Sequence, residues 1–190
     1  MKSNKSLVDE PNRRDAIIDA LVKNALTKGF HKASMNEVAK TASLSVGQIY
    51  RYFAHKDDII CALVERQTQT HLTYLDAFLD QEEWLNTFLE TPDKELVDYR
   101  IINAEINAEA ARNPKIAEIC QHSHRVLREQ SLTIMKQKYG MSREQAAPKV
   151  ELLVTLTEGI LNRAYLHDAP YSDDFETLMK ETLSFIFSNK

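Results

Sequence analysis

Apolar residues recur every three or four positions along most of the chain, and this spacing predicts amphipathic helices. No stretch alternates in the way that marks strands, and only four glycines and five prolines interrupt 190 residues. The sequence therefore predicts an all-α fold. The expected helices cover residues 12–28, 35–40, 46–52, a run of more than 20 residues from 56, 81–90, 93–112, 114–139, 143–167 and 173–188.

The second and third predicted helices each begin with the spacing of a capping box. Ser34 and Glu37 form an S-x-x-E pair, and Ser45 and Gln48 repeat it as S-x-x-Q. In such a box the serine side chain and the residue three positions later satisfy each other's backbone N–H groups. Two helices of this length joined by a tight turn make a helix-turn-helix, whose second helix enters a DNA major groove.

Residues in and beside this motif match those of a known family. They are Gly29, Phe30, Ser34, Met35, Val38, Ala39, residues 45–53 and Lys56. Over about residues 13–66 the chain resembles the DNA-binding region of the TetR/AcrR family of bacterial repressors. The tyrosine–aromatic–phenylalanine run followed by lysine is the most recognisable part. Family members often carry glycine in the turn where this chain has Ser43.

Two sets of side chains are expected to contact DNA. Glycine in a helix costs roughly 1 kcal/mol relative to alanine, so Gly47 needs a reason, and close approach to DNA supplies one. Tyr52 has an alternative as a packing residue against the first helix. Phosphate contacts are expected from Ser34, Asn36, Tyr50, Tyr52 and Lys56, and base-edge contacts from Ser45, Val46, Gln48 and Arg51.

Charge is distributed unevenly along the chain. The whole chain has a net charge of −4. Residues 1–71 carry 11 Lys and Arg against 8 Asp and Glu, or +3, and the remainder carries −7. A basic region on an acidic body is the pattern of a DNA-binding protein. We therefore expect a DNA-binding domain at 11–71, joined by the long fourth helix to a helical effector-binding and dimerisation domain at 72–190.

The predicted body has aromatic residues at inner helical positions beside a few polar ones, which favours a pocket for a small-molecule effector of unknown identity. A carboxylate among aromatics, such as Glu105, would suit a cationic or amphiphilic ligand. Each aromatic also fits an ordinary core. The candidate residues are Tyr74, Phe78, Trp84, Phe88, Tyr99, Asn103, Glu105, His122, Arg163 and Tyr165.

The last two predicted helices are more apolar than surface helices need to be, and this predicts a two-fold dimer built as a four-helix bundle. Gly159 would let two helices approach closely. A well-covered monomer core is the alternative, and the family resemblance implies the dimer. The expected interface residues are Leu152, Leu156, Gly159, Ile160, Leu178, Leu183, Phe185 and Ile186.

Catalytic patterns are absent from the sequence. Glu105 with Glu109, and Cys120 with His124, offer two ligands each, whereas zinc needs three or four. We therefore expect neither enzyme activity, nor a metal, nor a cofactor. Cys61 and Cys120 are expected to be reduced, with a redox switch as the minor alternative. No apolar run is long enough to span a membrane and no signal core precedes the helices, so we expect a cytoplasmic protein.

Together these features predict a repressor that a small-molecule effector releases from a palindromic double-stranded operator. The fourth helix would couple the effector site to the DNA-binding domain. One alternative is a DNA-binding regulator that answers to a protein partner or has no effector. Another is a helical interaction module that no longer reads DNA.

Overall fold

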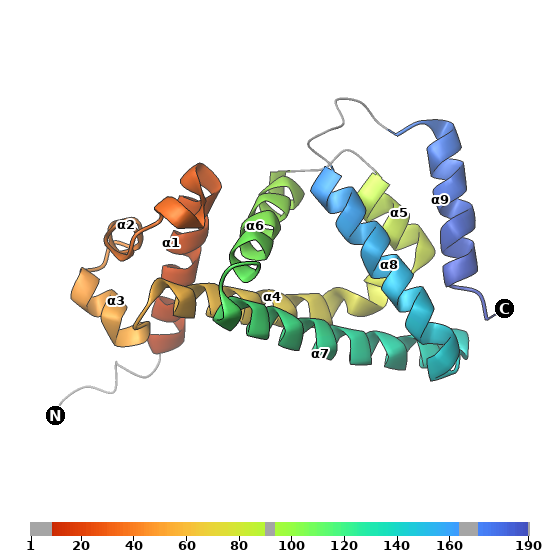
Figure 1. Ribbon diagram of the computed structural model, residues 1–190, viewed down its shortest axis with the longest axis horizontal. Coiled ribbons are helices and arrows are strands. Elements are labelled where there is room, and N and C mark those ends of the chain that lie inside the picture. The colour runs from red at the N-terminus through yellow and green to blue at the C-terminus, as the bar shows by residue number, and fades with distance from the viewer. Residues whose placement is uncertain (1–8, 90–93, 164–170, 190) are drawn as a thin grey trace. The chain divides into compact units, whose positions relative to one another are not determined.

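The computed structural model describes residues 9–89, 94–163 and 171–189. All regular secondary structure in these ranges is α-helical, which confirms the predicted fold class (Figure 1). The helices are α1 (Asp9–Lys32), α2 (Met35–Thr41), α3 (Val46–Tyr52), α4 (Lys56–Phe78), α5 (Gln81–Leu89), α6 (Lys94–Ala110), α7 (Pro114–Tyr139), α8 (Arg143–Arg163) and α9 (Asp173–Ile186).

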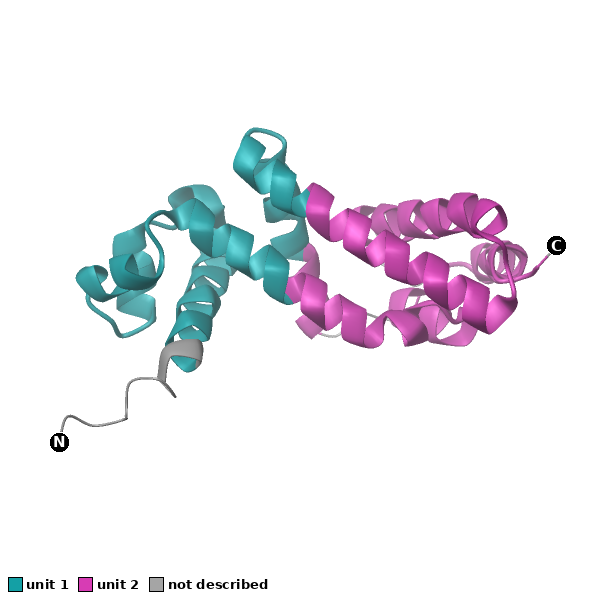
Figure 2. Cartoon of the chain, turned by 90° about the horizontal axis from the view of Figure 1, so that it is seen from below, with its two compact units in different colours: residues 1–66, 101–120 teal, residues 67–100, 121–190 magenta. Residues whose placement is uncertain are grey.

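The chain divides into two compact units (Figure 2). Unit 1 comprises residues 1–66 and 101–120, and unit 2 comprises residues 67–100 and 121–190. Helices α4, α6 and α7 therefore contribute residues to both units. The segment 101–120 was not expected in the same unit as the helix-turn-helix. Compactness alone does not define a DNA-binding domain, so the predicted domains at 11–71 and 72–190 stay predictions.

Unit 1 has a core of apolar side chains. Ile17, Phe30 and Ile49 are fully buried there. Ile106 from α6 and Ile116 from α7 belong to the same cluster, so the middle of the chain completes the core around the helix-turn-helix. Burial of such apolar surface is the main force that stabilises a small helical unit.

Helix α1 begins at Asp9, three residues before the expected start. Its range runs to Lys32, but Gly29 interrupts the helical geometry with φ 76° and ψ 162°, directly after the expected end at residue 28. This left-handed φ favours glycine, which explains why the break falls at this residue.

The turn between α2 and α3 is closed by a Schellman motif. The Leu44 N–H donates to the Ala39 carbonyl (2.9 Å) and the Ser43 N–H donates to the Lys40 carbonyl (3.2 Å). Ser43 occupies the left-handed position of this motif with φ 56°, where glycine is usual. The turn therefore has the geometry of a glycine-containing turn, although Ser43 adopts a positive φ less readily than glycine would.

Unit 2 contains α5, α8, α9 and the remaining parts of α4, α6 and α7. Trp84, Met135 and Leu153 are fully buried in its core. The predicted helices at 93–112 and 173–188 are slightly shorter in the structure, and the predicted end at residue 167 lies outside the described residues. Among the residues whose burial is described, buried polar residues occur in unit 2 and not in unit 1. They are Thr68, Ser131, Lys149 and Thr157.

Candidate nucleic-acid interface

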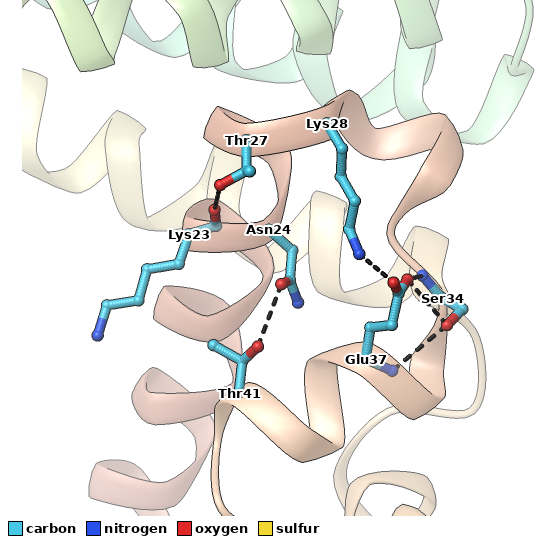
Figure 3. A network of polar contacts seen from close by, with 7 residues as sticks. All are labelled: Lys23, Asn24, Thr27, Lys28, Ser34, Glu37 and Thr41. Atoms are coloured by element: carbon cyan, nitrogen blue, oxygen red, sulfur yellow. Dashed lines mark hydrogen bonds and ion pairs between the residues drawn. The ribbon is translucent and has the colours of Figure 1, made fainter.

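Helix α2 begins with a complete capping box (Figure 3). The Ser34 hydroxyl accepts the Glu37 N–H (3.3 Å), and the Ser34 N–H donates to the Glu37 carboxylate (2.9 Å). The Lys28 ammonium also donates to Glu37. This hydrogen bond, together with those from Ser34, lowers the pKa of Glu37 to about 2. The carboxylate therefore stays ionised and connects the start of α2 to α1.

The other end of α2 is also connected to α1. The Thr41 hydroxyl donates to the Asn24 side-chain oxygen at 3.1 Å (Figure 3). Val38 and Ala39 lie between these two polar contacts and are buried in the unit 1 core. Helix α2 is thus fixed by its apolar face and by a polar contact at each end.

Helix α3 begins with the second predicted capping box. The Ser45 N–H donates to Gln48 Oε1 (2.8 Å), and the Ser45 hydroxyl accepts the Gln48 N–H (3.2 Å). The Gln48 carbonyl oxygen keeps a second lone pair and its amide keeps two donors. Gln48 can therefore contact a base edge without leaving the capping box.

The residues predicted to contact DNA differ in exposure. Most are exposed, while Val46, Gln48, Tyr52 and Lys56 are half-buried. Val46 and Tyr52 pack against the unit 1 core, so Tyr52 has a packing contact and its phosphate contact stays a prediction. The exposed members are Ser34, Asn36, Ser45, Gly47, Tyr50 and Arg51.

No close contact within the chain requires glycine at position 47. A Cβ atom built on it would have no neighbouring atom within 4 Å, apart from its adjacent residues and the backbone of its own helix. Alanine would fit there and would favour the helix by roughly 1 kcal/mol. The packing of the chain thus gives no reason for glycine here, and the close approach of this helix to DNA stays a prediction.

The residues predicted to bind an effector do not form one group. Phe78, Trp84 and Phe88 meet in unit 2, with ring centroids 5.9 Å apart for Phe78–Phe88 and 5.2 Å for Trp84–Phe88. Trp84 is fully buried and donates its indole N–H to Thr157 (3.0 Å). Tyr74 is 67% exposed.

The remaining effector candidates lie elsewhere. His122 and Arg163 are exposed, and Tyr165 lies outside the described residues. Asn103 and Glu105 belong to unit 1. The Glu105 carboxylate accepts the Phe30 N–H at 2.8 Å. It therefore gives no support to the expectation of a cationic ligand.

Two polar residues of unit 2 were not predicted, His71 and Arg100, and His71 lies against the predicted effector candidate Tyr99. The His71 ring stands edge-on to Tyr99 with centroids 5.6 Å apart. Burial lowers the pKa of His71 and raises the pKa of Tyr99 to about 12. Arg100 Nε is buried and has no hydrogen-bond partner within the described part of the chain. The sequence offered no indication of a role for His71 or Arg100 beyond their polarity.

The predicted dimer residues fall into two groups. Ile160, Leu183 and Ile186 are buried within unit 2 and serve its core. Leu156 is half-buried. Gly159 is exposed, and a Cβ atom built on it would have no atom within 4 Å, apart from its adjacent residues and the backbone of its own helix. The large exposed apolar members are Leu152 (39%), Leu178 (58%) and Phe185 (58%).

The other candidate chemistry is limited. Within the described ranges, no three His, Cys, Asp or Glu residues are grouped to hold a metal ion. Nor does any helix within those ranges have the length and apolar character needed to cross a membrane. Cys61 and Cys120 are free, and burial raises the pKa of both thiols. A raised pKa makes a thiol less reactive, which weakens the redox-switch alternative.

Comparison with known proteins identifies the family. A family model described as "Bacterial regulatory proteins, tetR family" matches residues 17–63. The chain is also 27% identical over 155 residues to the HTH-type transcriptional regulator UidR of Escherichia coli K12, covering 78% of this chain and 79% of UidR. The chain belongs to the TetR family of transcriptional regulators. It is accordingly a DNA-binding regulator.

Solved structures share the fold of this TetR-family regulator. GusR of Salmonella enterica superposes with a TM-score of 0.72 at 23% identity, covering 96% of this chain and 99% of GusR. The multidrug binding protein EbrR, described as complexed with malachite green, superposes with a TM-score of 0.62 at 22% identity, covering 93% and 98%. At these identities the likeness shows the fold alone.

In this TetR-family regulator, a predicted DNA contact outside the capping boxes, Lys56, also has a partner within the chain. The Lys56 ammonium donates to the Phe30 carbonyl at 2.6 Å. An ammonium has three donors, so a phosphate contact by Lys56 stays a prediction. Both Lys56 and Glu105 thus bind the backbone of Phe30, a link that residue spacing did not reveal.

Proposed function

We propose that this protein is a homodimeric repressor that binds a palindromic operator in the cytoplasm and leaves it when a small-molecule effector binds. The exposed polar face of α3 around Gly47 carries the DNA-reading part of this proposal. Exposed Ser45, Tyr50 and Arg51 suit phosphates and base edges. A dimer would present two such helices to two half-sites about one helical turn apart.

The reading role of α3 is tested by selecting binding sites from random DNA. Gln48→Ala should change which sequence is selected, because an amide reads a base edge directly. Gln48→Glu keeps an acceptor for the Ser45 N–H and should also change the selection. Tyr50→Phe removes one hydroxyl and should weaken all sequences alike. Unchanged selection by both Gln48 variants would show that this side chain does not read bases.

The effector part of the proposal is supported by polar groups inside unit 2. Arg100 Nε is buried without a hydrogen-bond partner among the described residues. Buried polar groups are almost always satisfied, so this atom favours a ligand with a hydrogen-bond acceptor. The multidrug binding protein EbrR, described as complexed with malachite green, has a similar fold and supports the proposal of an organic effector.

A second candidate is a regulator without a small-molecule effector. It is favoured by Trp84, which is fully buried and already hydrogen-bonded to Thr157, and so fills space proposed for a pocket. A thermal-shift screen of organic anions, cations, quinones and fatty acids separates the two candidates. No stabilising compound, together with operator binding that no compound alters, would favour this second candidate.

Release of the operator by an effector is tested by reciprocity. Coupling between two sites typically amounts to about 1–3 kcal/mol, or roughly 5–150-fold in affinity. Saturating operator DNA must then weaken effector binding by the same factor as the effector weakens operator binding. Equal effector affinity with and without operator would contradict the proposed switch.

The dimer is supported by exposed apolar side chains and an open glycine on α8 and α9. Leu178 and Phe185 are each 58% exposed, and Gly159 leaves room for another helix. Leu178→Glu should therefore weaken self-association measured by sedimentation while the monomer stays folded. Glu181→Lys on the same helix serves as a surface control. A Leu178→Glu protein with unchanged self-association would remove this face from the interface.

A further inference from the structure

The backbone of Phe30 is held from two other helices. Its carbonyl accepts from Lys56 Nζ (2.6 Å), at the start of α4, and its N–H donates to Glu105 Oε2 (2.8 Å), in α6. We call these two hydrogen bonds the Phe30 clasp. The Phe30 side chain is fully buried in the unit 1 core. All three residues belong to unit 1.

Gly29 makes room for the Glu105 half of the clasp. A Cβ at residue 29 would lie 3.1 Å from each Glu105 carboxylate oxygen. The φ of 76° at Gly29 independently disfavours any side chain. The carboxylate therefore lies directly against the backbone at the break in α1. A hydrogen bond to a charged acceptor is stronger than one between neutral groups, so this bond should hold the backbone of Phe30 in a fixed position.

The clasp joins the two ends of the helix-turn-helix. Phe30 lies four residues before Ser34, the cap of α2, and Lys56 lies four residues after Tyr52, the last residue of α3. The Lys56 bond therefore closes the segment into a loop, and Glu105 fixes the point of closure. Recognition requires side chains to stay within about 0.5 Å of their productive positions. Loss of the fixed point should degrade base reading before it unfolds the protein.

We propose that Glu105 is a positioning residue for specific DNA recognition, acting through Phe30 on the helix-turn-helix. This role replaces the effector contact expected from the sequence. It rests on the proposed reading role of α3 and is independent of any effector. Phosphate attraction depends on the number of cations near DNA, and base reading depends on geometry. Glu105 should therefore affect the ratio of specific to non-specific affinity.

The experiment measures the affinity of the full chain for its selected site and for unrelated DNA of the same length, by fluorescence anisotropy at one salt concentration. Glu105→Ala should lower the ratio of the two affinities by about tenfold, the effect of one lost charge-assisted hydrogen bond. Glu109→Ala is the matched control. It removes the same charge one turn along α6, where the carboxylate pairs with Arg112 (3.6 Å) and makes no contact in the clasp.

Two further variants separate charge from hydrogen bonding. Glu105→Gln loses the charge and keeps an acceptor of the same reach, so it should restore the ratio to within about threefold of wild type. Glu105→Asp keeps the charge and is one methylene too short, so it should behave like alanine. This pair also decides the matter if Glu105→Ala does not fold.

Other results would overturn the proposal. One is a Glu105→Ala protein with an unchanged affinity ratio. Another is an equal fall in specific and non-specific affinity that follows the unfolded fraction, as a purely structural role predicts. A third is an aspartate variant with better specificity than the glutamine variant. If the wild-type chain selects no DNA sequence, the reading role of α3 fails first, and the role of Glu105 fails with it.

Discussion

Units 1 and 2 use polar groups in different ways. In unit 1 the capping boxes and the Phe30 clasp hold helix ends and the backbone, and the described buried core side chains are apolar. In unit 2 polar side chains enter the core, where Lys149, Thr157 and Trp84 are buried with hydrogen-bond partners. Removing one polar partner in a core leaves the other unsatisfied, so unit 2 should be the more sensitive to polar substitutions.

The largest effect is expected at Lys149. Its ammonium donates to the carbonyls of Phe185 (3.0 Å) and Ser188 (2.6 Å) at the end of α9. Lys149→Ala should lower the free energy of unfolding by roughly 2–4 kcal/mol, because charged hydrogen bonds and the buried stem are lost together. Urea unfolding measures this. Lys136→Ala, at an exposed lysine of α7, should have little effect on the free energy of unfolding. An equal loss of stability in both variants would mean that the buried hydrogen bonds of Lys149 do not stabilise unit 2.

A smaller effect is expected at Thr157. Its hydroxyl donates to the Leu153 carbonyl (2.8 Å) and accepts the Trp84 indole N–H (3.0 Å). Thr157→Val leaves that N–H buried without a partner and should cost about 1–3 kcal/mol. Thr155→Val is the control, since Thr155 makes the same kind of backbone bond in the same helix and is exposed. When stability is measured by thermal unfolding, the free energy of unfolding of Thr155→Val should stay within about 0.5 kcal/mol of wild type.

Each unit has one helical glycine at which an added side chain would meet no neighbour, and replacing it with alanine should stabilise that unit. Gly47→Ala in unit 1 and Gly159→Ala in unit 2 should each raise the free energy of unfolding by about 0.5–1 kcal/mol, because alanine favours helix and meets no neighbour. Gly47→Ala should at the same time weaken DNA binding, and Gly159→Ala should weaken self-association. A gain in stability without either loss would mean that nothing approaches these glycines closely.

The smallest effect is a difference in acid sensitivity. Burial lowers the pKa of His71 in unit 2 below its ordinary value of 6.5. The unfolded chain then binds the proton first, so stability should fall as the pH drops below that value. In unit 1 the pKa of Glu37 is lowered from 4.5 to about 2, so its contribution is present above pH 4.5 and is lost as the pH falls towards 2.

Urea unfolding between pH 7.5 and 5 tests this difference. His71→Gln should flatten the fall in stability over this range, and His124→Gln, at an exposed histidine, should leave it unchanged. A fall of the same steepness in both variants would mean that His71 does not set the acid sensitivity of unit 2.

Local sequence patterns predicted local structure well. Helix α3 was predicted to the residue because its capping box lies within four positions, and α7 was predicted between Pro114 and Tyr139. The DNA-contact candidates follow from the same short motif. Their contacts with DNA stay predictions, although most of these side chains are exposed as that role requires.

Contacts between distant residues were beyond the reach of such patterns. Glu105 and Phe30 are 75 positions apart, and nothing in the spacing around either residue indicates the other. Apolar patterns also do not separate two faces of a helix that are both apolar. On α9, Leu183 is buried and Phe185 is 58% exposed, although both were predicted at one interface. Only the packing of the other helices decides which face is covered.

The presence of residues 101–120 in unit 1 has a consequence for protein synthesis. A nascent chain that has emerged only through α4 lacks Ile106 and Ile116 from the core and Glu105 from the clasp. Contacts between positions far apart also slow folding, since a long loop must close first. The helix-turn-helix should therefore acquire its final geometry on the ribosome only after more than half of the chain has been made.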